Sequence, residues 1–249
     1  MKTRADENIT EVNFGIRLIQ RAGMLTFGTD AFLLSAFARS RGNGFAADFG
    51  TGSGIIALLA SSGDSPFTHI DAIEQSSELC ELASRNSELN GVKTVTCINI
   101  DVRDYKGRSL DCIMTNPPYM RSGSGIENAD TLNNDARREH HGTIEDFAVS
   151  ASKALKVGGR FLVVYRPDRL PDLIFAMKQS GIEPKILIPV YHMAGRAPSL
   201  ILCEGVRGGG CDMKFTRDLI LNTKDGKRTD DAAYIYEKCL LPHDLLTGK

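Results

Sequence analysis

The stretch Asp48-Phe49-Gly50-Thr51-Gly52-Ser53-Gly54 decides the fold of this chain, because it joins an apolar strand to an apolar helix through three glycines. We expect the strand at residues 45–49 and the helix at residues 55–61. Glycine tolerates positive φ and lets the backbone approach a neighbour closely. The turn is therefore either a tight packing device or a place where the backbone meets a ligand.

Strands and helices alternate from residue 45 to about residue 185. We expect further strands at 68–74, 95–100, 110–114, 161–165, 185–191 and 199–206, and further helices at 76–90, 143–156 and 171–179. This alternation indicates an α/β fold with a mostly parallel sheet covered on both faces. The closing strand pair makes the last strand antiparallel, so we predict a doubly wound, seven-stranded sheet.

Two segments lie outside this alternating region. Residues 1–42 are predicted to form an extension that packs on the main domain, with a short hairpin at 14–27 and a helix that begins at Thr29-Asp30. The main domain spans residues 43–210. Residues 211–249 form a polar C-terminal tail with a weak strand at 219–221, to which the sequence assigns no role.

Composition excludes several classes of protein. The net charge of −1 shows no basic field of the kind that dominates many nucleic-acid-binding proteins. The six cysteines are scattered and contain no C-x-x-C pair, which favours reduced thiols in a cytoplasm. The N-terminus has no secretion signal, and no apolar run is long enough for a membrane span. We expect a cytoplasmic monomer.

The spacing of the glycines discriminates between cofactors. A phosphate-binding loop needs Gly-Lys-Ser/Thr, which is absent, and a dinucleotide fingerprint would need glycine where Ile55 stands. The third glycine is Gly54 instead, and Asp48 opens the turn. The pattern D-x-G-x-G-x-G fits S-adenosylmethionine better, with Asp48 placed to meet the amino group of that cofactor.

Two acidic residues follow the next strands. Glu74 ends the second strand, where a carboxylate can accept both hydroxyls of a ribose; the alternative is a solvated strand end. Asp101 follows the third strand and either accepts from the adenine amino group or caps a short helix at 102–105.

The stretch Thr115-Asn116-Pro117-Pro118-Tyr119-Met120 follows the fourth strand. Two prolines exclude a continued ladder and an immediate helix, which leaves a rigid extended turn. The side-chain oxygen of Asn116 and the carbonyl of Pro117 can each accept one N–H of an amine, and Tyr119 can stack on a base. The alternative is a Pro-Pro turn with a capping asparagine.

Residues 120–142 are polar and are expected to form a long loop at the same edge of the sheet. Arg121, Arg137 and Arg138 are candidates for phosphate contacts, and the alternative is a mobile charged loop. His140 and His141 adjoin Glu139, but adjacent histidines do not easily face one metal ion. We therefore expect no metal.

Together these motifs resemble class I S-adenosylmethionine-dependent methyltransferases of the N-P-P-Y group, which methylate amino nitrogens. Flanking segments resemble the bacterial tRNA adenine-N6 methyltransferases that modify the base beside the anticodon of a valine tRNA. These segments are residues 13–20, 27–34, 136–140, 165–170, 181–185 and 202–209. The resemblance covers roughly residues 11–210. It departs at Met120, where relatives often place phenylalanine.

The resemblance implies a Rossmann-like methyltransferase fold, tRNA as the partner and specific site residues. The implied cofactor-binding residues are Thr29, Asp30, Asp48, Gly50, Gly52, Gly54, Glu74 and Asp101. Asn116, Pro117 and Tyr119 would hold the target amine. Three alternatives stay open: a protein-glutamine methyltransferase, a ribosomal-RNA base methyltransferase and a non-catalytic RNA-binding module with the same fold.

Overall fold

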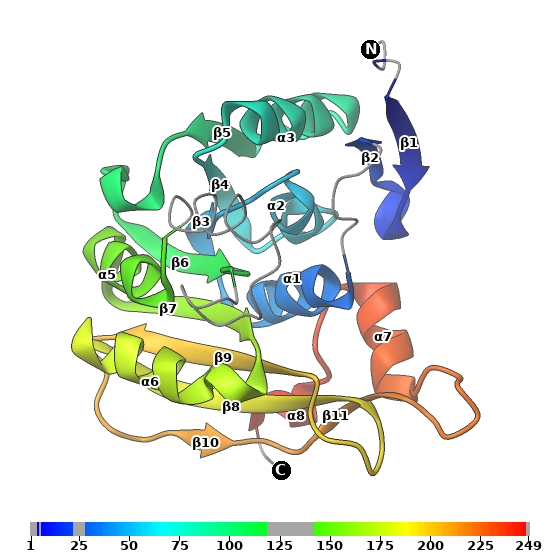
Figure 1. Cartoon of the computed structure of the whole chain (residues 1–249), viewed down its shortest axis with the longest axis vertical. Coiled ribbons are helices and arrows are strands. Elements are labelled where there is room, and N and C mark those ends of the chain that lie inside the picture. Colours follow the sequence, from blue (N-terminus) through cyan, green and yellow to red (C-terminus); the bar gives the residue numbers. More distant parts are fainter. Residues whose placement is uncertain (1–3, 5, 22–27, 119–141, 248–249) are drawn as a thin grey trace, which may run out of the picture.

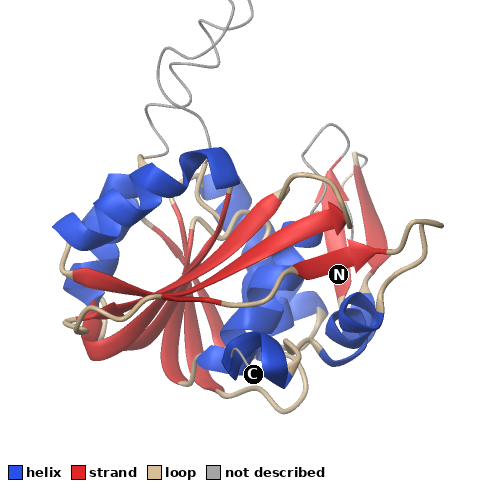
Figure 2. Cartoon of the chain, turned by 90° about the horizontal axis from the view of Figure 1, so that it is seen from below, coloured by secondary structure: helices blue, strands red, loops and turns tan. Residues whose placement is uncertain are grey.

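A twisted sheet forms the centre of the molecule, and helices cover both of its faces (Figures 1 and 2). The structure, a computed structural model, describes residue 4 and residues 6–21, 28–118 and 142–247. Four predicted site residues, Tyr119, Arg121, Arg137 and Arg138, lie outside the described residues, as does nearly all of the predicted loop at 120–142.

Within the described residues the main sheet has nine strands, in the order β10-β8-β9-β7-β6-β3-β4-β5, with β11 also paired to β8. The strands are β3 (Gly44–Phe49), β4 (Phe67–Glu74), β5 (Val95–Asn99), β6 (Leu110–Thr115), β7 (Leu155–Tyr165), β8 (Ile182–Met193), β9 (Leu200–Arg207), β10 (Lys214–Phe215) and β11 (Leu219–Asn222). Strand β9 lies between β7 and β8 and is antiparallel to both. The other pairings in this sheet are parallel, which confirms the predicted fold class.

The two faces of the sheet carry separate hydrophobic cores. Consecutive residues of β7 alternate between them: Leu162 and Val164 join one core, and Phe161 and Val163 join the other. This is the period of two that a strand buried on both faces requires. The helices on the first face include α1 (Thr29–Arg41), α2 (Ile55–Ser61), α7 (Asp230–Lys238) and α8 (His243–Thr247). Those on the second face include α5 (Ile144–Ala154) and α6 (Leu170–Gln179).

Local sequence sets the ends of several helices. Ser76 caps α3 (Ser77–Leu89) by accepting the backbone N–H of Leu79 at 3.4 Å. Thr143 forms a capping box with Asp146 at the start of α5. The sequence predicts that this helix reaches residue 156, but it ends at Ala154 because the chain turns extended at Leu155 and pairs with β6 there. None of the helices in the described ranges is long and apolar enough to cross a membrane.

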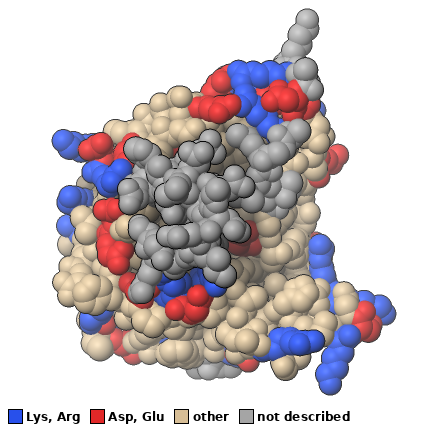
Figure 3. All heavy atoms as spheres, viewed as in Figure 1, with Lys and Arg blue, Asp and Glu red and all other residues tan. Residues whose placement is uncertain are grey.

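The N-terminal hairpin differs in position from the prediction at 14–27. Its strands are β1 (Glu7–Glu11) and β2 (Arg17–Arg21), which flank the short helix η1 (Asn13–Gly15). Ion pairs hold it on α3: the guanidinium of Arg85 contacts Glu7 at 2.6 Å, and that of Arg4 contacts Glu81 at 2.5 Å. Figure 3 shows charges of both signs next to one another around the edge of the visible face.

The C-terminal segment accounts for the two strands beyond the predicted seven. Strands β10 and β11 pair in parallel with β8 and so cover the edge of the sheet. Strand β11 confirms the weak strand predicted at 219–221, whereas β10 has only two residues, too few to give a recognisable apolar alternation. Helix α7 then packs beside α1 (Figure 1), where the ring of Tyr236 lies 4.9 Å from the ring of Phe32.

Candidate active site

The glycine turn after β3 combines two predicted roles, close packing between helices and exposure of the backbone to a cavity. A Cβ at Gly54 would lie 3.1 Å from the Cβ of Ala83, so this glycine lets α2 and α3 approach closely. A Cβ at Gly52 would meet no atom within 4 Å, and Gly52 lines a cavity. Both have positive φ, which glycine accepts without strain. Gly54 thus serves packing, and Gly52 faces the site.

Asp48 lies beneath this turn rather than in the cavity wall. Its side chain is fully buried, and burial raises its pKa to about 7, although the Thr51 hydroxyl opposes that shift. Thr51 Oγ1 donates to Asp48 Oδ2 at 2.6 Å. Asp48 is not among the residues that line the cavity, so its predicted contact with a cofactor amino group stays a prediction.

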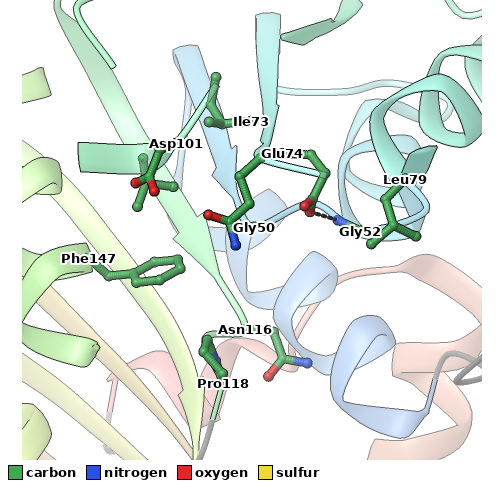
Figure 4. A pocket seen from close by; sticks show the side chains of 11 residues that line it. Gly50, Gly52, Ile73, Glu74, Leu79, Asp101, Asn116, Pro118 and Phe147 are labelled. Atoms are coloured by element: carbon green, nitrogen blue, oxygen red, sulfur yellow. Dashed lines mark hydrogen bonds between the residues drawn. The ribbon is translucent and has the colours of Figure 1, made fainter. Parts of the chain in front are cut away.

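Glu74 ties the end of β4 to the glycine turn. Its Oε2 accepts the backbone N–H of Gly52 at 3.0 Å, and its Oε1 accepts that of Ser76 at 2.9 Å (Figure 4). Only 6% of the residue is exposed. The alternative of a solvated strand end is therefore wrong, and the carboxylate is held in the wall of the cavity.

Asp101 satisfies the capping prediction and also lines the cavity. It caps the short helix η2 (Val102–Asp104) by accepting the backbone N–H of Arg103 at 2.8 Å. The Arg103 guanidinium binds the same carboxylate, with Nε at 2.9 Å from Oδ1. The two roles predicted for Asp101 are thus compatible.

The turn after β6 brings the predicted acceptor to the same cavity. Asn116 and Pro118 line it, while Pro117 is buried. Thr115, the last residue of β6, donates its hydroxyl to the backbone oxygen of Phe49 at 2.8 Å and so joins the ends of β6 and β3. Asn116 Nδ2 donates to Asp30 Oδ2 at 2.6 Å.

Thr29 and Asp30 lie beside the cavity rather than in its wall. Among the described residues they are not part of the lining, and Asp30 instead contacts Asn116. Thr29 Oγ1 accepts from the Tyr236 hydroxyl at 3.4 Å. Both side chains thus contact other protein side chains, and their predicted contact with the cofactor stays a prediction.

The cavity measures about 260 Å³ and opens at the carboxyl ends of β3, β4, β5 and β6 (Figure 4). Glu74 and Asp101 give it two carboxylates, and Ile73, Val102 and Phe147 give it apolar walls. Apolar walls suit a flat heterocycle, and a buried carboxylate suits ribose hydroxyls. The residues present therefore fit the S-adenosylmethionine expected from the sequence. The described residues contain no group of three His, Cys, Asp or Glu arranged to hold a metal ion.

Sequence reasoning missed several residues of the cavity wall, among them Gln75, Leu79 and Phe147, and also missed Asn86, which supports the glycine turn. Phe147 comes from α5, and its ring lies 3.5 Å from where a Cβ of Gly50 would stand; no sequence motif links the two. Asn86 is fully buried, donates to the backbone oxygen of Ser53 at 2.9 Å and accepts the N–H of Ile19 at 2.7 Å. A polar residue on the apolar side of a predicted amphipathic helix was the available signal for Asn86.

Comparison with known proteins identifies relatives of this chain. Residues 22–174 match the methyltransferase small domain family. A protein of Citrobacter koseri named tRNA1(Val) (adenine(37)-N6)-methyltransferase is 33% identical, over 80% of this chain and 81% of that relative. A protein of the same name from Tolumonas auensis is 28% identical, over 70% of this chain and 73% of the relative.

Solved structures agree in fold. A predicted O-methyltransferase of Agrobacterium tumefaciens superposes with a TM-score of 0.67 at 19% identity, over 86% of this chain and 98% of that one. A 16S rRNA N2 G1207 methyltransferase of T. thermophilus, solved with AdoMet and guanosine, gives a TM-score of 0.54 at 16% identity, over 81% of this chain and 50% of that one.

Proposed function

Since this chain belongs to the methyltransferase small domain family and is an S-adenosylmethionine-dependent methyltransferase, we propose that its acceptor is the exocyclic 6-amino group of an adenine in tRNA. The names of its relatives support the adenine at position 37 of a valine tRNA, next to the anticodon.

One observation carries this proposal. A single cavity is lined by the carboxylates of Glu74 and Asp101 on one side and by Asn116 and Pro118 on the other. Glu74 ends β4, Asp101 follows β5, and Asn116 and Pro118 follow β6; these strands are parallel, with β3 between β6 and β4, so their carboxyl ends lie at one edge of the sheet. Ligands of open α/β sheets bind at that edge. This arrangement supports an amine acceptor beside a nucleoside site.

The cofactor would lie between the glycine turn and the carboxylates. Gly50 and Gly52 leave room for it, Glu74 would accept ribose hydroxyls, and Asp101 would accept the adenine amino group. Asp48, beneath the turn, would meet the amino group, whose positive charge would favour the ionised form of this buried carboxyl. When bound, S-adenosylmethionine supplies an electrophilic methyl group on a sulfonium sulfur.

The turn after β6 would hold the nucleophile. The lone pair of an adenine 6-amino nitrogen is delocalised into the ring, so the amine attacks poorly unless its geometry is fixed. The Asn116 side-chain oxygen and the Pro117 carbonyl would each accept one N–H, which directs the lone pair toward the methyl group. The nitrogen would form its bond to the methyl carbon as the bond from that carbon to the sulfonium sulfur breaks; the sulfur would leave as the neutral thioether of the demethylated cofactor, and the nitrogen would then release one proton to solvent.

Other predicted substrate contacts rest on the sequence. Tyr119 would stack on the target base, which must leave its own stack to enter the site. Arg121, Arg137 and Arg138 would contact phosphates, so replacing all three with alanine should reduce the salt slope of tRNA binding by about one unit per phosphate that an arginine neutralises. An unchanged slope and affinity would remove these arginines from the proposal.

The direct test is methyl transfer to tRNA from a strain that lacks the enzyme, with the modified nucleoside identified by mass spectrometry. Asn116→Ala should reduce the rate by about 10²–10³-fold, by analogy with the loss of one oxyanion-hole donor, and leave cofactor affinity within a factor of two. Methylation of a protein glutamine or a ribosomal RNA base instead would establish one of the alternative substrates. Cofactor binding without transfer to any of these acceptors would favour a non-catalytic module.

A further inference from the structure

The hydrogen bond between Asn116 and Asp30 decides which end of the asparagine amide faces the substrate. The amide has one end that donates and one that accepts, whereas an ionised carboxylate can only accept. Because Asp30 Oδ2 lies 2.6 Å from Asn116 Nδ2, the nitrogen must face Asp30. Figure 4 shows the oxygen and the nitrogen of Asn116 on opposite sides of the side chain. The oxygen is thereby turned away from α1.

This orientation matters because the proposed acceptor, an amine, presents N–H groups. An amide in the opposite orientation would place its own N–H groups against those of the amine, and no hydrogen bond would form. A short hydrogen bond to a charged acceptor is about twice as strong as a neutral one, and it polarises the amide so that its oxygen accepts more strongly.

Asp30 is itself held in place by the start of α1. Its other oxygen, Oδ1, accepts the backbone N–H of Ala31 at 3.0 Å, and a carboxylate is favoured in the first turn of a helix. Gly28 precedes the helix, and a Cβ there would stand only 2.7 Å from Asp30 Oδ1. The glycine therefore leaves the room that the carboxylate occupies.

The C-terminal segment contacts the start of α1, which carries Asp30. The hydroxyl of Tyr236 donates to Thr29 Oγ1 at 3.4 Å, and its ring packs on Phe32 with centroids 4.9 Å apart. The Arg228 guanidinium lies over the Tyr236 ring, 3.9 Å from its centroid. Asn13 donates to the Tyr236 backbone oxygen at 2.5 Å, which adds the N-terminal hairpin to the support.

We infer that Asp30 is a positioning residue that fixes the Asn116 amide with its oxygen toward the target amine, and that Tyr236 of the C-terminal segment holds the turn that carries Asp30. The inference rests on the proposed function, since it assigns Asp30 to the acceptor. It also gives residues 211–249 a part in building the active site. The competing role for Asp30 is the one expected from sequence, a contact to the cofactor.

Four variants separate the two roles: Asp30→Ala, Asp30→Asn, Asn116→Ala and the double variant Asp30→Ala/Asn116→Ala. Asp30→Ala should lower kcat on tRNA about 10–100-fold, with KM for tRNA and affinity for the demethylated cofactor within a factor of two. Asp30→Asn keeps an acceptor oxygen of the same shape and should recover at least a third of the wild-type kcat. In the Asn116→Ala background, Asp30→Ala should cause no further loss, because Asp30 acts through Asn116.

A matched control removes the first-turn aspartate of another helix. Asp172→Ala in α6 breaks its ion pair with Arg169, away from the cavity, and should leave kcat unchanged. A readout without cofactor is also available in the side-chain amide ¹⁵N–¹H signals of Asn116, assigned by their loss in Asn116→Ala. One proton of this pair should move upfield in Asp30→Ala as its hydrogen bond is lost, and remain in place in Asp172→Ala.

Each contrary result has a distinct meaning. A fall of tenfold or more in cofactor affinity in Asp30→Ala would make Asp30 a cofactor ligand and overturn the inference. The inference would also be overturned if the reductions in kcat of the two single variants multiplied in the double variant. Unchanged Asn116 amide signals in Asp30→Ala would overturn it as well. If the wild-type protein binds the cofactor but methylates no tRNA, the proposed function fails instead, and the amide signals still report whether Asp30 orients Asn116.

Discussion

The two sides of the active-site cavity are built from different kinds of contact. The cofactor wall, formed by Gly52, Glu74 and Asp101, is joined by bonds between residues 22 and 2 positions apart, Gly52 to Glu74 and Arg103 to Asp101. The acceptor wall, formed by Asn116, Asp30 and the turn behind them, is joined by bonds that span 86 and 207 positions. The bonds of the cofactor wall join segments that are close in the sequence, whereas the acceptor wall exists only once distant segments have packed together.

This difference predicts that the two walls fail independently. A change in the cofactor wall should reduce cofactor affinity and leave the orientation of Asn116 intact. A change in the acceptor wall, or in the C-terminal segment that supports it, should reduce turnover and leave cofactor affinity intact. Single substitutions can test that separation, and the first of them has the largest expected effect.

Glu74→Gln should lower affinity for S-adenosylmethionine and its demethylated product about 10²–10³-fold. The carboxylate accepts two backbone N–H groups at 3.0 and 2.9 Å, whereas an amide must turn its NH₂ toward one of them. Hydrogen bonds to charged groups contribute about 1.5–3 kcal/mol each, so the loss is large. Calorimetry measures it, and Glu183→Gln, which breaks the surface pair with Lys178, is the control. Affinity within twofold of wild type would show that Glu74 is not a cofactor residue.

Asp48→Asn should change the pH dependence of stability. Burial raises the Asp48 pKa to about 7 from its ordinary value of 3.8, so between these pH values the folded state holds a proton that the unfolded state has lost. The contribution of Asp48 to stability therefore falls as pH rises from about 4 to about 7, and is level above that. An asparagine has no carboxyl group to ionise in the interior. The free energy of unfolding of the variant, relative to wild type, should therefore rise by about 2–3 kcal/mol between pH 5 and pH 7. Urea unfolding at pH 5 and pH 7 measures this gain. If the free energies of unfolding of variant and wild type differ by the same amount at both pH values, Asp48 titrates normally.

The sequence predicted the cofactor wall better than the acceptor wall, and the reason is physical. Glycine spacing and an acidic strand end are local patterns, so Gly52 and Glu74 were predicted from their neighbours in the chain, and both line the cavity. In the acceptor wall only Asn116 has such a local pattern, the Pro-Pro turn. The pairing of Asp30 with Asn116 depends on how α1 packs against the sheet, which no local pattern specifies. The sequence accordingly indicated Asp30 as a site residue but gave no sign of its contact with Asn116.

The fold shows the same limit. The alternating apolar segments predicted the strands from β3 to β9, because each is long enough to bury a recognisable pattern. Strands β10 and β11 have only two and four residues, and pairing with the exposed edge of β8 stabilises them. The sequence therefore predicted only a weak strand at 219–221 in the tail after residue 210, although that tail completes one side of the sheet.

Tyr236→Phe tests the support behind the acceptor wall with a smaller expected effect. It removes only the hydroxyl, whose bond to Thr29 is long at 3.4 Å, and retains the ring against Phe32. We expect kcat to fall about two- to fivefold, since a neutral hydrogen bond contributes about 0.5–1.5 kcal/mol, with cofactor affinity unchanged. Tyr234→Phe, on the exposed side of the same helix, is the matched control. Equal kcat values for the two variants would limit the C-terminal segment to a role in stability.

The smallest change adds one methyl group at Gly28 and alters no polar atom. The backbone there has φ of −104°, which any residue can adopt, so Gly28→Ala introduces no strain of its own. Its Cβ would stand 2.7 Å from Asp30 Oδ1, closer than atoms approach, and the carboxylate must move. Since Asn116 is held at 2.6 Å by the same carboxylate, we expect kcat to fall about two- to threefold while cofactor affinity stays constant, consistent with a few tenths to one kcal/mol for a slightly misplaced hydrogen bond.

Gly28→Ser separates this displacement from an effect on helix stability. Gly28 is the N-cap of α1, and serine is a good N-cap whereas alanine is a poor one, so alanine should reduce thermal stability and serine should not. Both residues carry the Cβ that displaces Asp30. If kcat falls in both variants while only alanine lowers the melting temperature, the position of the carboxylate controls turnover. If kcat falls only with alanine, the start of α1 affects kcat through the stability of the helix. The Asp30 carboxylate can then move and still keep its hydrogen bond to Asn116.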